Sequence, residues 1–321
     1  MGKGKKRLLK AIIALLAILV IADIGGSIFM VNVVALKPNK RVESEALSFF
    51  CEKHPDLKPW IDSLKAANDW HYADTTFNGN KLHALYITAA QPTNKVAVLI
   101  HGYKDCNISM LHVAEIYSRK LGYNVILPDL YAHGKSEGDH INMGWNDRLD
   151  VMQWMKYANN LFKGDSAQTQ MVVHGISMGA ATTMCISGEK QEPYVKCFVE
   201  DCGYTSVADE FRNELKRTYS FLPAFPMLQT ASLICKLEYG WSFEEASPIE
   251  QVKKSTLPML FIHGDDDDFV PYSMLQPLYE AKTTGPKEIY IGKGSKHAKT
   301  LNDHKAEYTA KVINFVRKYI K

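Results

Sequence analysis

The chain has 321 residues, and 46% of them are apolar, which is enough for one large hydrophobic core. The formal net charge is +3, but the first ten residues carry five positive charges and no acid, so the remainder carries 3 − 5 = −2. Because this nearly neutral body has no basic face or stripe of the kind that binds nucleic acid, we expect no nucleic-acid partner.

A strongly apolar segment follows the basic start. Residues 11–22 include no polar side chain, and after Asp23 the apolar character resumes from Ile24 to Leu36 around Asn32. At about 25 residues, the segment is long enough to cross a bilayer as a helix. Asp23, near its middle, would cost roughly 3 kcal/mol in the membrane. We therefore separate residues 1–36, a membrane anchor or signal peptide, from a body formed by residues 37–321.

The sequence of this segment is compatible with two main fates. As an uncleaved anchor, it would be held with its N-terminus inside by the positive flank, giving a single-pass protein of the cell membrane. As a signal peptide, it would be cleaved near Ala35, after the small residues of Val33-Val34-Ala35, and the body would be secreted. Both fates place the body outside the cytoplasm, and we favour the anchor. A third alternative is a segment packed onto the globular domain.

Strands and helices alternate along the body. Two alternating runs, 70–77 and 81–88, flank an Asn-Gly turn and predict a hairpin. Six further strands are expected at 96–100, 124–127, 171–173, 195–199, 258–262 and 288–291, with helices over 110–120, 145–161 and 306–320. The pattern predicts an α/β fold, with a mostly parallel eight-stranded sheet and helices on both faces.

One interval interrupts the alternation. Residues of about 206–248 are rich in aromatic side chains, among them Phe211, Phe221 and Trp241. Such an insertion is typical of a helical lid over a pocket. The alternative is a helical pair that buries the same side chains against the edge of the sheet.

The six cysteines form no recognisable disulfide framework and no C-x-x-C pair of the kind that binds zinc. We expect free, buried thiols. Cys197 and Cys202 lie on or beside one strand at an odd spacing, which predicts that they point to opposite faces.

The most informative motif is His174-Gly175-Ile176-Ser177-Met178-Gly179. It follows a β-prone run and opens a helix-tolerant one, so it predicts a strand, a sharp turn and a helix, with Ser177 at the apex. The flanking glycines permit a backbone turn that a Cβ would block. Ser177 is therefore a candidate nucleophile, and the alternative is a serine that only caps the helix.

A serine nucleophile needs a base, and the base needs an orienting carboxylate. The loop after the strand at 258–262 offers four aspartates, Asp265 to Asp268, and His297 follows the last strand. The order serine, acid, histidine is the one expected for a sheet fold with such a serine turn. Four other histidines near strand ends are expected to be structural: His101, His133, His174 and His263.

An oxyanion hole needs two backbone N–H groups. Met178 follows the serine at a helix N-terminus, where N–H groups are free. Tyr103 follows the strand at 96–100, and the adjacent Gly102 lets the backbone approach closely. We expect these two N–H groups to be the donors.

With these elements in order, the chain resembles the α/β-hydrolase superfamily from about residue 70 to the C-terminus. Residues 128–138 look like its G-H-G-x-S segment, with Ala132 replacing the first glycine. Gly144-Trp145 and Ser247-Pro248-Ile249 resemble the membrane-anchored cell-surface hydrolases of Gram-positive bacteria, a group with serine aminopeptidase-like and prolyl-oligopeptidase-like members. The superfamily pattern H-G-x-x-D-x-x-V-P aligns its acid with Asp267, and Asp266 is the next candidate.

The resemblance implies a hydrolytic serine but no particular substrate. We favour a carboxylesterase acting on a small-molecule ester, because an aromatic lid suits an acyl chain. The alternative is a serine peptidase acting on short peptides, with Glu244 and Glu245 holding the free amine. A third hypothesis is a non-catalytic surface binding module. The mechanism requires no metal and no organic cofactor, and the aspartate run lacks the spacing of an EF-hand.

Overall fold

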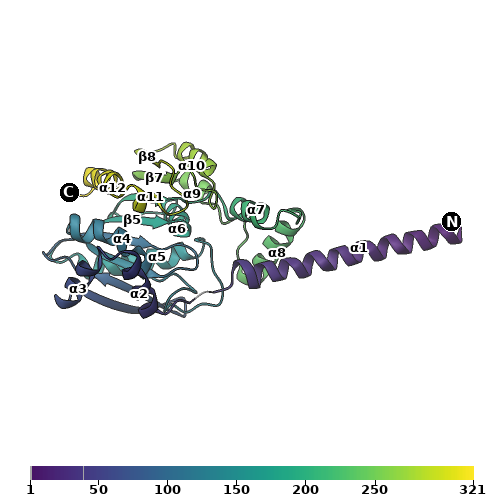
Figure 1. Ribbon diagram of the computed structural model, residues 1–321, viewed down its shortest axis with the longest axis horizontal. Helices are drawn as coiled ribbons and strands as arrows, with labels where there is room; N and C mark the ends of the chain where they lie inside the picture. The colour runs from purple at the N-terminus through teal and green to yellow at the C-terminus, as the bar shows by residue number, and fades with distance from the viewer. Residues whose placement is uncertain (1, 39) are drawn as a thin grey trace.

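The computed structural model describes residues 2–38 and 40–321. Figure 1 shows a long N-terminal helix, α1 (Lys3–Phe29), that projects from a body containing the sheet. A short π-helical segment, η1 (Met30–Ala35), continues α1 toward the body. Within the described residues, one helix, spanning residues 3–35, is long and apolar enough to cross a membrane.

The centre of the body is one mixed sheet of eight strands, as predicted. Its order is β1-β2-β4-β3-β5-β6-β7-β8; β1, β2 and β4 pair antiparallel in succession, and every other pair is parallel. The strands are β1 (Trp70–Phe77), β2 (Asn80–Ile87), β3 (Lys95–Ile100), β4 (Asn124–Pro128), β5 (Gln170–Ile176), β6 (Val195–Asp201), β7 (Met259–Gly264) and β8 (Lys287–Gly292).

Helices cover both faces of the sheet, and a few short ones close the loops. In chain order they are α2 (Glu43–Lys53), α3 (Lys58–Ala66), η2 (Asn107–Met110), α4 (Leu111–Glu115), η3 (Ile116–Lys120), α5 (Asp147–Phe162), α6 (Met178–Ser187), α7 (Val207–Thr218), α8 (Met227–Tyr239), α9 (Pro248–Val252), η4 (Tyr272–Met274), α10 (Leu275–Ala281), α11 (Thr300–Asp303) and α12 (Lys305–Tyr319). The helix predicted over 110–120 is divided among η2, α4 and η3.

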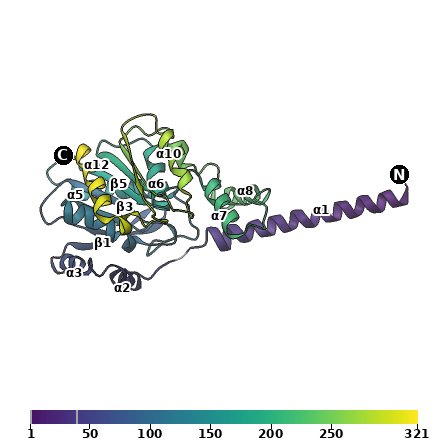
Figure 2. The same cartoon turned by 45° about the horizontal axis from the view of Figure 1, so that its top comes forward.

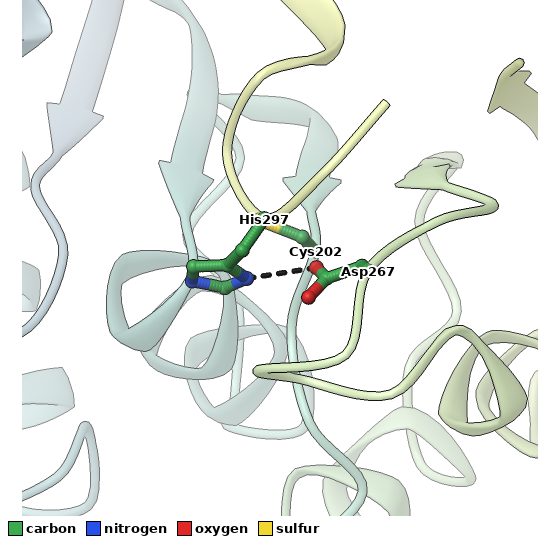
Figure 3. Close-up of side chains that lie close together, drawn as sticks. All are labelled: Cys202, Asp267 and His297. Carbon is green, nitrogen blue, oxygen red and sulfur yellow. Dashed lines mark hydrogen bonds and ion pairs between the residues drawn. The ribbon is translucent and has the colours of Figure 1, made fainter. Parts of the chain in front are cut away.

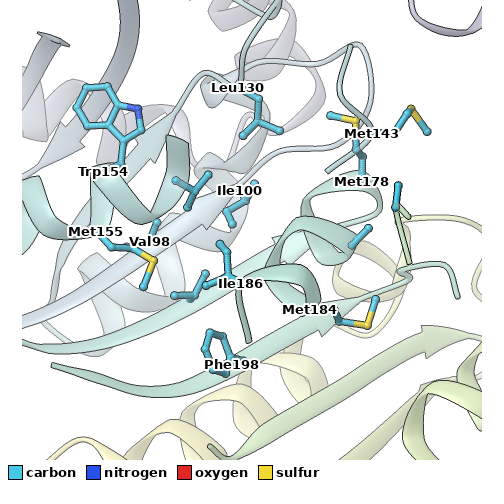
Figure 4. Packing of buried hydrophobic residues seen from close by; sticks show 14 of the residues in the cluster. Val98, Ile100, Leu130, Met143, Trp154, Met155, Met178, Met184, Ile186 and Phe198 are labelled. Atoms are coloured by element: carbon cyan, nitrogen blue, oxygen red, sulfur yellow. The ribbon is translucent and has the colours of Figure 1, made fainter. Parts of the chain in front are cut away.

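Alternation along the strands separates two hydrophobic clusters. Val96, Val98 and Ile100 of β3 face the cluster with α5 and α6, whereas Ala97 and Leu99 face the opposite cluster with α4 and α12. Figure 4 shows the first cluster, where side chains of α5 and α6 pack on the sheet. Because both faces are covered, the central strands are mostly apolar.

The cysteine prediction was partly wrong. All six cysteines are free, and five of them are buried. Cys197 and Cys202, however, belong to the same hydrophobic cluster rather than to opposite faces. Cys202 lies just beyond β6 with φ of 53°, so the strand alternation no longer sets the direction of its side chain.

Candidate active site

The candidate residues lie at the carboxyl ends of neighbouring strands. Tyr103 follows β3, Ser177 follows β5, Asp267 follows β7 and His297 follows β8. The strand order reverses between β3 and β5, because β4 lies beyond β3 on one side and β6 beyond β5 on the other. In an open α/β sheet, this switch point is where a crevice forms and ligands bind.

Ser177 occupies a strained turn between β5 and α6. Its φ and ψ are 59° and −119°, a backbone conformation that is costly for a residue with a Cβ. Close packing holds the turn: a Cβ on Gly179 would lie 2.0 Å from the carbonyl oxygen of Ile100, and one on Gly175 would lie 2.0 Å from that of Gly179. The glycines in the motif are thus required for close approach, while Ser177 itself carries the strain.

The structure brings the three predicted side chains into one hydrogen-bonded chain. Oγ of Ser177 lies 2.8 Å from Nε2 of His297, and Nδ1 of His297 lies 2.8 Å from Oδ2 of Asp267. Since an ionised carboxylate only accepts, Nδ1 carries the proton and Nε2 is free to accept the serine hydroxyl. This tautomer is the one in which an imidazole serves as a base toward a serine.

Asp267 is buried, and both of its carboxylate oxygens have polar partners. Its Oδ1 accepts hydrogen bonds from the backbone N–H groups of Phe269 and Val270, each at 3.0 Å. Nε2 of His263 lies 3.3 Å from its Oδ2. Burial opposes ionisation of Asp267, but hydrogen bonds from His263 and His297 outweigh it and hold the pKa below its ordinary value. The neighbouring Asp266 is exposed.

Cys202 lies behind this pair. Figure 3 shows its side chain beside His297 and Asp267, and the ligand atoms of all three lie within 4.8 Å of one another. Burial raises the pKa of the Cys202 thiol well above its ordinary value, so it remains protonated. Because thiolates, and not thiols, bind metals, this group is poorly suited to hold a cation.

The two expected oxyanion donors flank the serine. A Cβ on Gly102 would lie 3.5 Å from the Cβ of Ser177, so the loop after β3 passes directly over the turn. Met178 is the first residue of α6, where an N–H group has no partner within the helix. Among the hydrogen bonds of the described residues, none is donated by the backbone N–H of Tyr103 or Met178.

The four other histidines bond to loops and to tyrosines. His101 accepts a hydrogen bond from the backbone N–H of Leu130, and His133 from that of Lys104. His174 lies between two tyrosine hydroxyls. Burial lowers the pKa of His101 to about 4 and those of His133 and His174 to about 3, so all three are neutral.

Two cavities meet at Ser177. One, of about 280 Å³, is mostly apolar and is lined by η1, α7, α8 and the loop after β3. The other, of about 520 Å³, lies toward α2 and the loop after β8. Three cationic side chains line this second cavity: Arg41, Lys53 and Lys299.

The carboxylate pair chosen from the sequence lies elsewhere. Glu245 pairs with Lys236, and Glu244 accepts a hydrogen bond from Ser232; neither lines the cavities at Ser177. Glu210 and Glu214, one turn apart on α7, do line the apolar cavity. Burial, with the negative charges of Glu214 and Asp267, raises the pKa of Glu210 to about 9.

Sequence reasoning missed three contributors to the site. His263 contacts Asp267, and the ring of Phe269 lies 4.8 Å from that of His297. Four residues of the apolar segment form part of the cavity wall: Met30, Val31, Val34 and Ala35. His263 was signalled by its place four residues before Asp267, but nothing in the local pattern linked the N-terminal segment to the serine.

A family model described as the prolyl oligopeptidase family matches residues 115–321, more than half of the chain and a range that includes Ser177, Asp267 and His297. The chain belongs to this family. It is therefore a hydrolase of the α/β-hydrolase superfamily, as the motifs predicted.

The chain is also similar to individual proteins. The uncharacterized protein YqkD of Bacillus subtilis is 29% identical over 232 residues, 72% of this chain and 74% of that protein. Bovine lysophosphatidylserine lipase ABHD12 is 24% identical over 247 residues, 75% of this chain but 58% of the lipase. The solved structure of the Pyrococcus furiosus esterase Pf2001 has a TM-score of 0.66 at 21% identity, covering 89% of this chain and 99% of the esterase, which shows a shared fold.

Proposed function

We propose that this protein is a serine hydrolase that cleaves carboxylic esters and is held at the membrane by its N-terminal helix. The observation that carries the proposal is the hydrogen-bonded chain from Ser177 through His297 to Asp267, with both separations at 2.8 Å. A nucleophile, a base and an orienting carboxylate in this relation are the groups that acyl transfer needs. A non-catalytic binding module would have no use for all three.

In the first step, Oγ of Ser177 attacks the ester carbonyl while Nε2 of His297 takes its proton. Asp267 holds Nδ1–H and stabilises the imidazolium that forms. The backbone N–H groups of Tyr103 and Met178 bind the developing oxyanion. His297 then gives its proton to the alkoxide oxygen, and the alcohol leaves an acyl group on Ser177.

In the second step, water replaces the alcohol. His297 takes a proton from the water as its oxygen attacks the acyl carbonyl, and the same two N–H groups bind the second oxyanion. The proton returns from His297 to Oγ of Ser177 as the acyl bond breaks. The carboxylic acid departs, and the enzyme is restored without a metal or an organic cofactor.

The apolar cavity favours an ester with an acyl chain. It begins at Ser177 and continues between α7 and α8 along side chains such as Met227, Leu228 and Phe243. A methylene group buried there gains about 0.8 kcal/mol, so chain length should raise affinity up to the length of the cavity. The relation to a lysophosphatidylserine lipase favours the same class of acyl substrate.

A peptidase acting on short peptides is the second candidate. Membership in the prolyl oligopeptidase family favours it, and Glu210 with Glu214 forms a carboxylate pair in the cavity beside Ser177. The raised pKa of Glu210, about 9, opposes this candidate, because a neutral carboxyl attracts an ammonium group weakly. We therefore favour the ester.

The contacts of the apolar segment favour an anchor that is retained. Ser27, Val31 and Leu36 are buried in the body, and η1 forms part of the cavity wall. Cleavage after Ala35 would remove this wall and expose the apolar side chains beneath it. The positive flank at residues 3–10 favours an N-terminus on the cytoplasmic side, with the body outside.

A comparison of two substrate series tests the proposal. The full chain in detergent is offered p-nitrophenyl esters of two to twelve carbons and, separately, aminoacyl p-nitroanilides. Hydrolysis of the esters, rising in kcat/KM with chain length and absent in Ser177→Ala, is expected. Hydrolysis of the anilides alone would favour the peptidase and overturn the ester assignment.

A further inference from the structure

The α7–α8 region exposes large apolar side chains. Phe221 and Phe225, in the connection between the two helices, are 80% and 75% exposed, and Leu233 and Leu237 of α8 are 59% and 76% exposed. None of the four lines the cavity at Ser177. Elsewhere in the described body, only a few scattered side chains of this size are exposed, such as Leu149 and Leu161 of α5. An apolar surface of this kind marks a site of contact.

This surface lies beside the N-terminal helix. Figures 1 and 2 both show α8 alongside the end of α1 that is nearer the body. Oγ1 of Thr230 donates a 2.6 Å hydrogen bond to Asp23, and Oγ of Ser27 donates one to the carbonyl of Met227 at 3.1 Å. Leu233 and Leu237 follow Thr230 by three and seven residues, so they share its flank of α8.

Helix length determines where the bilayer must lie. Residues 3–22 are all exposed, whereas one face of the helix from Asp23 onward is covered, mainly by α8. The apolar part of the uncovered stretch, residues 11–22, extends only about 18 Å at 1.5 Å per residue. A hydrocarbon core is about 30 Å thick, so the span must also include about eight residues after Ala22. Those are the residues that α8 contacts.

We propose that α8 and the α7–α8 connection insert into the leaflet nearer the body, beside α1, so that the apolar cavity receives its acyl ester directly from the bilayer. The substrate is then an amphiphile that resides in the membrane. This inference rests on the proposed ester hydrolase and names where its substrate comes from.

The two sides of α8 suit this arrangement. Met227, Leu228 and Ala231 line the cavity, while Leu233 and Leu237 lie on the exposed flank. The cavity and the flank proposed to face lipid are therefore separated by the width of one helix. Asp23, which is costly in a membrane, obtains a hydrogen-bond donor from Thr230 at the depth where it needs one.

Four charged groups near this surface are paired. Lys236 pairs with Glu245, and Arg217 pairs with Glu214, so these charges are partly neutralised. Such groups are compatible with the headgroup layer, where an interfacial helix places its polar side. The rival occupant of this surface is a second copy of the chain, and the experiment must separate it from lipid.

The first measurement uses tryptophan fluorescence of the full chain in phosphatidylcholine–phosphatidylglycerol vesicles. Phe225→Trp adds an emission that lipids with brominated acyl chains should quench by about half, relative to wild type. Leu161→Trp, on α5 of the body, is the matched control and should not be quenched. Equal quenching in the two variants would overturn the proposal. The proposal would also be overturned if the added tryptophan were shielded in a way that depends on the density of protein in the vesicles and not on bromination of the lipid, because that result would indicate a second copy of the chain.

The second measurement is activity. The combined variant Phe221→Ser, Phe225→Ser, Leu233→Gln and Leu237→Gln should lose about tenfold or more in hydrolysis of a long-chain ester carried in vesicles. Hydrolysis of water-soluble p-nitrophenyl acetate should stay within about twofold, as should both activities of the control Leu149→Gln and Leu161→Gln. Equal losses on both substrates would contradict lateral access.

Failure of the proposed ester hydrolysis can be distinguished from failure of the proposed insertion. Because insertion needs no catalytic activity, the fluorescence measurement is also made in the Ser177→Ala background, where the same quenching is expected. Quenching of Phe225→Trp, together with no ester hydrolysis by the protein that retains Ser177, would support insertion and overturn the proposed function. Ester hydrolysis without quenching would leave the proposed function standing and overturn insertion.

Discussion

The phenol of Tyr103 donates a hydrogen bond to the main-chain carbonyl of Ala35 at 2.5 Å. Nζ of the next residue, Lys104, donates to the carbonyl of Val34 at 3.1 Å. The loop that carries a proposed oxyanion donor is therefore bonded to the end of the proposed membrane anchor. Movement of the N-terminal segment would alter the cavity wall and this loop together.

Replacing Tyr103 with phenylalanine tests what the phenol does. The substitution keeps the backbone N–H and removes the donor to Ala35, whose loss costs about 1 kcal/mol. We expect KM for long-chain esters to rise about fivefold, with kcat for p-nitrophenyl acetate reduced no more than about threefold. Steady-state kinetics of the two enzymes measure both parameters. A hundredfold fall in kcat would show that the phenol takes part in the catalytic step.

The N-terminal segment should remain attached to the mature protein. Its buried side chains and its place in the cavity wall favour retention over cleavage. Intact-mass analysis of protein extracted from membranes should give a species that still contains residues upstream of Leu36, and alkaline carbonate should not release it. A mature protein beginning at Leu36 would show that the segment is a signal peptide.

Three substitutions test the proposed roles around Ser177. His297→Ala and Asp267→Asn should each lower kcat by about 10³- to 10⁴-fold, because each leaves the serine without an oriented base. Together they should lower it little further, since the residues act as a unit. Asp266→Asn, on the exposed neighbour, is the control and should change kcat by less than about twofold. A larger loss for Asp266→Asn would reassign the acid.

Glu210 should make stability depend on pH. Its folded pKa, about 9, lies above the ordinary 4.5, so between these values the folded state binds the extra proton and stability falls as pH rises. Glu210→Gln removes this dependence. Thermal unfolding of the full chain in detergent should show the variant gaining about 3 °C or more over wild type between pH 5 and pH 8. A constant difference across this range would contradict the raised pKa.

Local pattern predicted much of the fold. The positions of the strands could be predicted from short apolar runs, because a strand that is buried on both faces consists mainly of apolar residues. The chain order of serine, acid and histidine indicated which strand ends would meet. The structure brings Ser177, Asp267 and His297 within hydrogen-bond distance, and their catalytic roles stay predictions.

Contacts between distant segments were beyond prediction from one sequence. Asp23 and Thr230 are separated by 207 positions, and neither residue carries a periodic signal that selects the other. The prediction named the wrong carboxylate pair for a related reason. Glu244 and Glu245 stand out in the sequence because they are adjacent. Glu210 and Glu214 line the same cavity only because α7 turns both side chains toward it.

A fluorophosphonate tests whether Ser177 is an activated nucleophile. The full chain is incubated with the reagent, and the labelled protein is then examined by peptide mass spectrometry. We predict one adduct, on the peptide containing Ser177, with no labelling of Ser177→Ala and strongly slowed labelling of His297→Ala. Absence of labelling in the folded wild-type protein, or an adduct on another residue, would show that Ser177 is not the activated nucleophile.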